Sequence, residues 1–425
     1  MTIKKTICLV GTVILLIAIG GLFGCSKKEV ASERGVRAET PPTREVEAKK
    51  EVAGSKSQKE YFKEAGKAFK RAKEAPASDF VYGLADAGDG VIIKDYKIGN
   101  TPKDPVELLM YLNRDSEIED SVEPVEIVIP SEIEGLPVVE LGDEVFRNSP
   151  VKTVVIPESV KRFGSGLFRE ARHLQYVKLP TTITSLLGQF FASCDSLEYF
   201  IIPDHITHIG GSAFSFSGLR AIEIPDTVTT FEDWDSLFSH CKNLEYVKLP
   251  NEIKTLCYTF RDCTALKQVI LPESLETLEN NVFVGCRSLE QIDLPNTLTF
   301  IEPGTFSGSG LRSISIPESV TNFQDLTLAS CGQLEAITLP DNVTHINNKL
   351  LGRGNKNLKR INLPASLQSI ENGAFYELSS LEELIIPENL TTIDWGEEND
   401  AFYGTALPLA TQAKLKQLGY PGKFN

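Results

Sequence analysis

Five histidines are the residues of this sequence best suited to acid–base or metal chemistry, and none has a catalytic spacing. They are His173, His205, His208, His240 and His345. No HExxH pair, GxSxG turn, P-loop or GxGxxG segment accompanies them. The abundant carboxylates are scattered over positions that we expect to face solvent. The sequence therefore predicts neither an enzyme nor a bound cofactor.

Cysteines and acidic side chains are the other groups through which this chain could bind a metal. No CxxC pair and no His/Cys cluster has the spacing of a zinc site. Asp86 and Asp89 lack the ligand run and closing Glu of an EF-hand loop, so a turn explains them better. The acidic segment 394–400 is a minor candidate for calcium, and we predict no metal site from it. Its ligands would be Asp394, Glu397, Glu398 and Asp400.

The N-terminal segment has the pattern of a secretion signal. Two lysines precede the short apolar run 7–19, and a small residue leads into Cys25. The stretch LFGC (22–25) resembles a bacterial lipobox, which implies cleavage before Cys25 and a lipid on that cysteine. A transmembrane anchor is the alternative, although the run is shorter than the ~20 residues that a span needs. We therefore interpret 1–24 as a lipoprotein signal peptide and expect the rest of the chain to be exported.

Charge divides the remaining chain into a basic linker and an acidic body. Residues 26–78 carry 14 Lys and Arg against 9 Asp and Glu, whereas residues 79–425 carry 27 against 49. An acidic body argues against nucleic acid as a partner, because nucleic-acid binders present basic faces. A basic segment beside a lipid anchor tolerates anionic headgroups. We predict a lipid anchor and basic linker at 25–78.

One segment of the linker has helical periodicity. Within 57–75 apolar residues recur at helical spacing, and Pro76 follows as a stop. These residues are Tyr61, Phe62, Ala65, Ala68, Phe69 and Ala72. The pattern predicts a helix that is either a spacer or a basic amphipathic helix lying on the membrane surface.

From about residue 125 onward the sequence repeats. A proline follows an apolar-x-apolar phrase at intervals of 22 to 27 residues, a period that fits leucine-rich repeats. These prolines stand at 130, 157, 180, 203, 225, 250, 272, 295, 317, 340, 364 and 387. Every turn of such a chain runs the same way, so short strands such as 311–316 must stack in parallel. The proline cannot donate to a strand ladder and therefore ends each strand.

Other positions of the repeat predict ladders of like side chains. A Ser, Thr or Asn two residues after most of the prolines would satisfy backbone groups at the turn. A phenylalanine about eleven residues after most of the prolines predicts a buried aromatic spine, with Leu328 and Leu351 filling two gaps. Five cysteines stand three residues after spine positions and predict buried thiols, with disulfides between neighbouring turns as the alternative. They are Cys194, Cys241, Cys263, Cys286 and Cys331.

The repeated phrase resembles the BspA-type leucine-rich repeat family. IPDHITHIGGSAF (202–214) and LPASLQSIENGAF (363–375) carry its pattern, and 130–146 resembles its first repeat. The resemblance covers about 125–405. It implies an α/β solenoid, a leucine-rich repeat horseshoe with short parallel concave strands. It also implies a bacterial surface protein, since members are typically surface proteins and some are adhesins.

Two flanking segments predict caps for this solenoid. In 79–124, two extended runs surround a turn at 87–90 and predict a β-hairpin as the N-terminal cap. Segment 406–425 resembles a C-terminal helical cap, with Gly419 as its stop.

The concave sheet is the surface that a solenoid offers to a partner. Tyr176, Tyr199 and Tyr246 share one outward position, and Lys178 and Lys248 stand beside two of them. Aromatic residues with a polar tip are common interface anchors. The pattern predicts a contact patch, and ordinary exposed strand residues are the alternative.

Both tryptophans lie in acidic insertions that lengthen their turns. Trp234 lies in 229–238 and Trp395 in 391–402. Insertions in repeat proteins map to one face and often carry function, so these segments are candidate binding loops. The alternative is that each indole folds back over the spine.

These features predict a lipid-anchored protein at the bacterial cell surface that binds a protein ligand. The resemblance implies surface binding, by an adhesin for a host extracellular-matrix or plasma protein or by another interaction module, and it does not identify the ligand. A periplasm-facing structural or scaffolding lipoprotein without a host ligand is the alternative. Nothing in the sequence predicts the oligomeric state.

Overall fold

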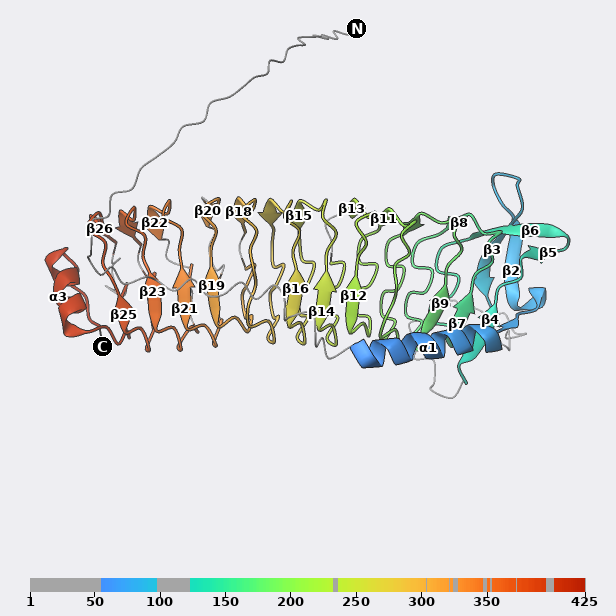
Figure 1. Ribbon diagram of the computed structural model, residues 1–425, viewed down its shortest axis with the longest axis horizontal. Coiled ribbons are helices and arrows are strands. Elements are labelled where there is room, and N and C mark those ends of the chain that lie inside the picture. The colour runs from blue at the N-terminus through green and yellow to red at the C-terminus, as the bar shows by residue number, and fades with distance from the viewer. Residues whose placement is uncertain are drawn as a thin grey trace, which may run out of the picture. The chain divides into compact units, whose positions relative to one another are not determined.

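A computed structural model describes one compact unit within Glu51–Asn425. The described residues are 55–97, 123–231, 236–302, 304–320, 322–323, 328–346, 350–351, 354–371, 373–394 and 401–424. The repeats coil into a solenoid whose successive turns lie side by side (Figure 1). Across these residues, no helix has the length and apolar character that crossing a membrane requires.

Each turn contributes a short strand from the segment before its proline. Neighbouring strands pair in parallel, for example Tyr246 with Gln268 and Ser313 with Ala336. We call these strands together the first-strand face. They are β4 (Val125–Val128), β7 (Val151–Val155), β9 (Tyr176–Lys178), β12 (Ala221–Glu223), β14 (Tyr246–Lys248), β16 (Gln268–Ile270), β19 (Ser313–Ser315), β21 (Ala336–Thr338), β23 (Arg360–Asn362) and β25 (Glu383–Leu384). The predicted solenoid with stacked parallel strands is confirmed.

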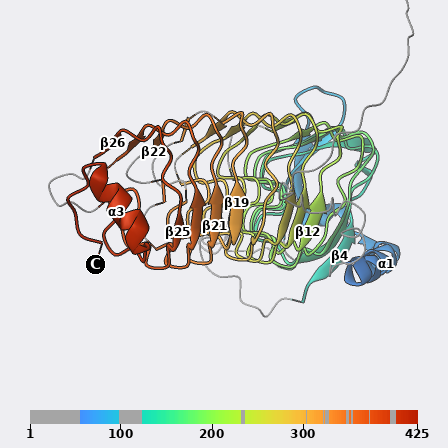
Figure 2. The same cartoon turned by 60° about the vertical axis from the view of Figure 1, so that its left-hand side comes forward.

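A second, two-residue strand follows the proline in most turns and was not predicted. These strands also pair in parallel, on a different side of the solenoid (Figure 2). They are β8 (Arg162–Phe163), β10 (Ser185–Leu186), β11 (His208–Ile209), β13 (Thr230–Phe231), β15 (Thr255–Leu256), β17 (Thr277–Leu278), β18 (Phe300–Ile301), β20 (Asn322–Phe323), β22 (His345–Ile346), β24 (Ser369–Ile370) and β26 (Thr392–Ile393). No helix occurs between these strands in the described part of the repeats. The repeat region is therefore a β-solenoid of stacked parallel strands.

The proline corner between the two strands is held by side chains of the next turn. The Oγ of Ser274 donates a hydrogen bond to the carbonyl of Ile253 at 2.8 Å, and Thr297 bonds Leu275 in the same way. Ser366 repeats this bond to Val343 at 2.8 Å. These carbonyls would otherwise lack partners where the strand ends. The predicted role of the small polar residue after the proline is confirmed.

The aromatic spine runs through the core of the stack. Consecutive rings from Phe146 to Phe306 have centroids 5.3 to 5.7 Å apart and nearly parallel planes. Every ring in this run is fully buried. Offset stacking of aromatic rings adds to the free energy of burying their area. The predicted spine is confirmed, and it ties each turn to its neighbours.

Left-handed residues flank each spine ring and shape the turn around it. Tyr258 (φ 49°) and Asp262 (φ 56°) stand two residues before and after Phe260. Glycines take both places around Phe306. A left-handed conformation strains residues other than glycine, so the turn is maintained by the hydrogen bonds between turns. An example is the bond from Phe260 N to Val282 O, 3.0 Å long.

At the N-terminal end, a hairpin continues the stack. β2 (Phe80–Leu84) pairs antiparallel with β3 (Val91–Tyr96), and β3 pairs in parallel with β6 (Leu136–Leu141). A short 3-10 helix, η1 (Ala77–Asp79), precedes β2. Tyr96 lies 5.3 Å from Phe146, over the first ring of the spine. β5 (Glu132–Ile133) folds back antiparallel on β6.

At the C-terminal end, helix α3 (Leu409–Gln417) lies across the last turn (Figure 2). Leu415 is its fully buried residue. Beyond the helix, Tyr420 packs edge-on against Phe402 at 5.2 Å. The last spine ring is thus covered by an aromatic side chain, as the first is by Tyr96.

We predict that Phe260→Ala destabilises the solenoid by about 3–5 kcal/mol, because it leaves a cavity between two stacked rings. Urea unfolding followed by circular dichroism measures the loss. Phe216→Ala is the matched control, since this ring is 52% exposed and should cost under about 1 kcal/mol. Equal losses in the two variants would contradict a structural role for the spine.

Candidate functional site

Helix α1 (Ser55–Arg71) packs on the first strands of the first-strand face, at the N-terminal end of the solenoid (Figure 1). It contacts β4, β7 and β9. Its apolar side faces the strands, with Ala65 and Ala68 buried and the flanking aromatic residues Tyr61, Phe62 and Phe69 half-buried. The helix is therefore neither an isolated spacer nor free to lay its apolar side on a membrane, which corrects both interpretations of segment 57–75.

The end of α1 also differs from the prediction. The helix stops at Arg71, five residues before Pro76, because Lys73 and Glu74 form strand β1 (Lys73–Glu74). β1 pairs in parallel with β4, so that the backbone hydrogen bonds of the sheet replace those of the helix. Arg71 makes a bidentate ion pair with Glu126 on β4, with one N–O distance of 2.9 Å. These contacts hold the helix at its C-terminal end.

Tyr61 of α1 fills the space between two of the predicted contact residues. Its ring centroid lies 4.9 Å from that of Tyr176 and 5.1 Å from that of Tyr199. The Tyr61 hydroxyl donates a hydrogen bond to the carbonyl of Gln175. Burial raises the pKa of Tyr61 well above its usual value. The chain's own helix thus occupies this part of the first-strand face.

Phe62 and Phe69 extend this aromatic cluster on either side. Phe62 lies 6.4 Å from Tyr199, and Phe69 lies 6.4 Å from Tyr176. Tyr199 is almost completely buried, at 3% exposure. The sequence predicted the helix and the tyrosines separately, but it did not predict that they pack against each other.

The third predicted tyrosine, Tyr246, lies further along the same face. Tyr246 on β14 is half-buried, and its hydroxyl donates to Glu223 at 3.5 Å. Burial, reinforced by Glu223, raises the pKa of Tyr246 to about 12, so the side chain is neutral and a hydrogen-bond donor at neutral pH. Lys248 stands on the same strand and Ile270 is exposed beside it on β16. We call these residues, on β12, β14 and β16, the open strand face.

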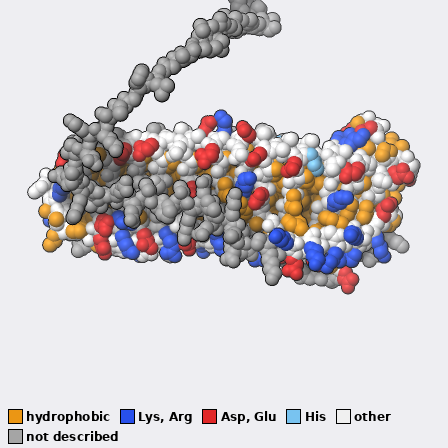
Figure 3. All heavy atoms as spheres, viewed as in Figure 1, with side chains coloured by type: hydrophobic (Ala, Val, Ile, Leu, Met, Phe, Trp, Pro, Cys, Tyr) orange, Lys and Arg blue, Asp and Glu red, His pale blue; other side chains and the backbone are white. Residues whose placement is uncertain are grey.

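A ladder of alternating charges runs along the edge of the first-strand face. From Glu198 to Glu382, the residue after the first Leu of each strand segment alternates between acidic and basic in successive turns, and Figure 3 shows the alternation along the lower edge. Lys267 pairs with Glu245 at 2.6 Å, and Arg312 lies between Glu290 at 3.1 Å and Glu335 at 3.8 Å. Exposed pairs contribute at most about 1 kcal/mol each. The ladder favours the correct register of turns. The alternation of charge at this repeat position is the sequence pattern that could have predicted it.

The cysteine ladder consists of buried thiols, as predicted. Each Sγ donates to the carbonyl of the spine residue one turn earlier, for example Cys241 to Phe214 and Cys263 to Phe238, both at 3.0 Å. Burial raises the pKa of Cys241 to about 11, although Ser217 lowers it in part. The thiols therefore have a structural environment and not that of an activated nucleophile.

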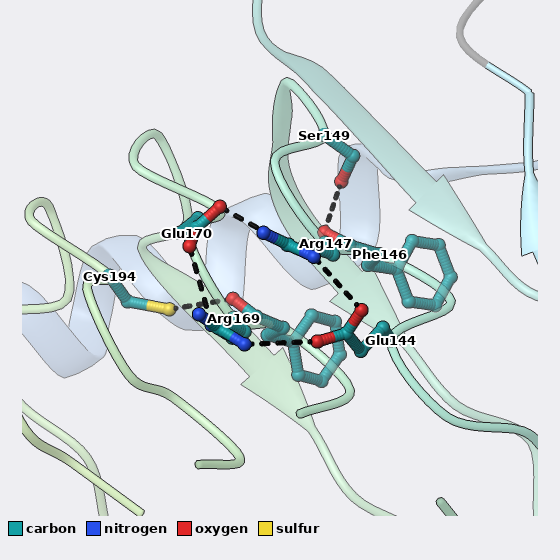
Figure 4. A network of polar contacts seen from close by, with 8 residues as sticks. Glu144, Phe146, Arg147, Ser149, Arg169, Glu170 and Cys194 are labelled. Atoms are coloured by element: carbon teal, nitrogen blue, oxygen red, sulfur yellow. Dashed lines mark hydrogen bonds and ion pairs between the residues drawn. The ribbon is translucent and has the colours of Figure 1, made fainter. Parts of the chain in front are cut away.

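An ion-pair network lies on the surface of two adjacent turns near the N-terminal end of this ladder (Figure 4). Arg147 bridges Glu144 and Glu170, both at 3.2 Å. Arg169 bridges the same two carboxylates, at 3.2 and 3.3 Å. The four side chains come from two adjacent turns, so the network joins those turns on the surface.

One histidine has neighbours that resemble a catalytic set. His240 Nδ1 is 2.7 Å from the Oγ of Ser239, and its Nε2 is 3.4 Å from Asp262. Ser239 is only 4% exposed, so a substrate carbonyl could not reach its Oγ. The imidazole instead stacks on Phe216 at 4.4 Å. Among the described residues, no group of three His, Cys, Asp or Glu could hold a metal ion.

Several predicted residues lie outside the described residues. They are Cys25, Trp234, Trp395, Glu397, Glu398 and Asp400. Lys178 is described and is exposed on β9.

Comparison with known proteins agrees with the repeat pattern. The profile of the BspA type leucine rich repeat region matches in six copies, over residues 139–257, 234–353 and 353–416. A leucine-rich repeat protein from Bacteroides ovatus has a similar structure, with a TM-score of 0.59, 22% identity, and coverage of 82% of this chain and 97% of that chain. No curated protein matches this chain.

Two further solved structures match over most of their length but superpose less well. A leucine-rich repeat protein from Eubacterium ventriosum is 19% identical, with a TM-score of 0.45 and coverage of 78% of this chain and 94% of that chain. The T. pallidum leucine-rich repeat protein is 21% identical, with a TM-score of 0.20 and coverage of 83% and 98%.

We predict that Tyr61→Ala loosens helix α1 from the strands by about 2 kcal/mol, because it removes two ring contacts and their buried area. Hydrogen exchange of the amides in 55–71 should accelerate by roughly 30-fold. Lys63→Ala is the control, because Lys63 is exposed on the same helix. Unchanged exchange in Tyr61→Ala would show that the aromatic cluster does not hold the helix.

Proposed function

This chain belongs to the BspA type leucine-rich repeat family, and on that premise we propose that it is an exported bacterial protein that binds another protein through its first-strand face. One observation carries the proposal. The face already binds an amphipathic helix of its own chain, by stacking Tyr61 between Tyr176 and Tyr199. Strands of this composition can therefore serve as a docking surface for a polypeptide.

The open strand face supplies the same chemistry without the helix. Tyr246 offers an aromatic ring with a polar tip, and Ile270 offers exposed apolar area. Glu223 and Lys248 place one charge of each sign beside the ring. Interface hot spots combine an aromatic anchor with a polar surround in this manner. A partner segment with one apolar side and mixed charges fits this surface.

Anchoring and location complete the proposal. A lipid on Cys25 would hold the chain to the membrane, and the solenoid would project at the cell surface as an adhesin. The partner would then be an extracellular-matrix or plasma protein of a host. Support comes from the lipobox-like segment before Cys25 and from the family, whose members are typically surface proteins.

The location is tested by protease shaving of intact cells. We expect the solenoid to be lost from a blot while a periplasmic control protein persists, because an outward-facing chain is accessible to the protease. Protection until the envelope is broken would remove the adhesin proposal. It would then favour the alternative of a scaffold within the envelope.

The binding face is tested with immobilised matrix and plasma proteins. For any protein that the unmodified chain binds, Tyr246→Ala should weaken binding about tenfold or more, because anchor residues dominate interface energy. Surface plasmon resonance measures the change. Tyr403→Ala removes an exposed tyrosine that stacks on Tyr376, outside the open strand face, and should leave affinity unchanged.

Equal affinities of the two variants would move the binding site away from the open strand face. Binding to none of the immobilised proteins would argue against a host ligand of this class, whatever the location of the chain.

A further inference from the structure

The side of helix α1 opposite the strands carries a stripe of lysines. Lys59, Lys63, Lys67 and Lys70 are all exposed. Their spacing of three and four residues places them on one side of a helix. The residues that contact the strands, such as Tyr61 and Ala68, lie on the other side. We call these four residues the lysine stripe.

Most of the lysine stripe has no carboxylate partner within the described residues. Lys67 pairs with Glu64 on the same helix at 2.5 Å. No ion pair joins Lys59, Lys63 or Lys70 to a described carboxylate, whereas the basic residues of the charge ladder have such partners on the adjacent turns. Neighbouring lysines at this spacing repel each other and weaken a helix. Ion pairing therefore accounts for only one of the four lysines of the stripe.

The chemistry of the stripe favours an extended anionic surface over a small ligand. Ammonium groups on long, exposed stems act as separate point charges and do not form a concave, oriented pocket. The acidic body of the chain, with 49 Asp and Glu against 27 Lys and Arg in 79–425, would be repelled by an anionic bilayer. The stripe is thus the part of the described structure that such a surface attracts.

The position of α1 in the chain keeps the stripe within reach of a membrane to which Cys25 is anchored. Only 30 residues separate Ser55 from Cys25, and a chain of that length cannot extend beyond about 100 Å. This step rests on the lipid anchor of the proposed function. A tethered cationic surface meets the headgroups at a high effective concentration.

We propose that the lysine stripe of α1 binds the anionic headgroups of a phospholipid bilayer, while the apolar side of the same helix holds the solenoid. The helix is then an adaptor between the membrane and the repeats. Each lysine at an anionic surface strengthens the association by about fivefold. The contact depends on salt, because the Debye length falls from about 8 Å at physiological ionic strength to 3 Å at 1 M.

The test measures how fast each lysine of the full chain reacts with a membrane-impermeant amine reagent in the presence of vesicles. Mass spectrometry reads each site separately. In phosphatidylglycerol vesicles, Lys59, Lys63 and Lys70 should react at least about threefold more slowly than in phosphatidylcholine vesicles. The difference should vanish at 1 M salt. Lys242, exposed in a turn of the repeats, should react equally in both.

Two variants with the same loss of charge sharpen this test. Lys59→Gln, Lys63→Gln and Lys70→Gln together should abolish the protection of Lys67 in phosphatidylglycerol vesicles. The control combines Lys242→Gln, Lys254→Gln and Lys416→Gln and should retain it. All six side chains are exposed, so neither variant should disturb the fold.

Three results would overturn the proposal. Equal reaction rates in the two vesicle types would show that the stripe does not bind anionic lipid. Equal slowing in both types, relative to vesicle-free protein, would indicate a contact that does not depend on headgroup charge. Equal slowing by soluble glycerol phosphate would indicate a site for free anions. None of these results bears on binding of a protein at Tyr246, so the two proposals fail separately.

Discussion

Each turn of this solenoid satisfies its backbone hydrogen bonds through the turn beside it. A buried amide or carbonyl without a partner costs free energy comparable to a lost hydrogen bond, so turns must stack in register along the whole chain. This register brings equivalent positions of successive repeats into contact. The rings of the spine, the thiols that donate to the spine carbonyls and the hydroxyls at the proline corner are consequences of this one requirement.

Features that recur once per turn could be predicted from the sequence, because register converts a period in sequence into contact in space. The spine around Phe260 and the thiol of Cys263 are examples. The second strand was missed because two residues are too short to show an alternating pattern. Its pairing, as between Thr255 and Thr277, exists only because the turns on either side are already in register.

The position of helix α1 could not be predicted for a different reason. The helix occurs once and does not recur from turn to turn, and its contacts join residues as far apart as Tyr61 and Gln175. Its apolar periodicity showed that one side must be buried but did not identify the surface that buries it. A membrane and a protein face satisfy that pattern equally well. Only the fold distinguishes them, because it brings Tyr176 and Tyr199 to the side of the strands where a ring of the helix fits between them.

Burial of the apolar side on the strands changes the role of the charged side. A helix that inserts its apolar residues into a bilayer uses its lysines only to reinforce that insertion. Here the apolar side stabilises the contact with the repeats, so the lysine stripe remains as an independent surface. The same helix also limits which strands are available to a partner, because it covers Tyr199 and leaves Ile270 exposed. The membrane contact and the partner site that we propose therefore lie on different parts of the molecule, and neither proposal requires the other's residues.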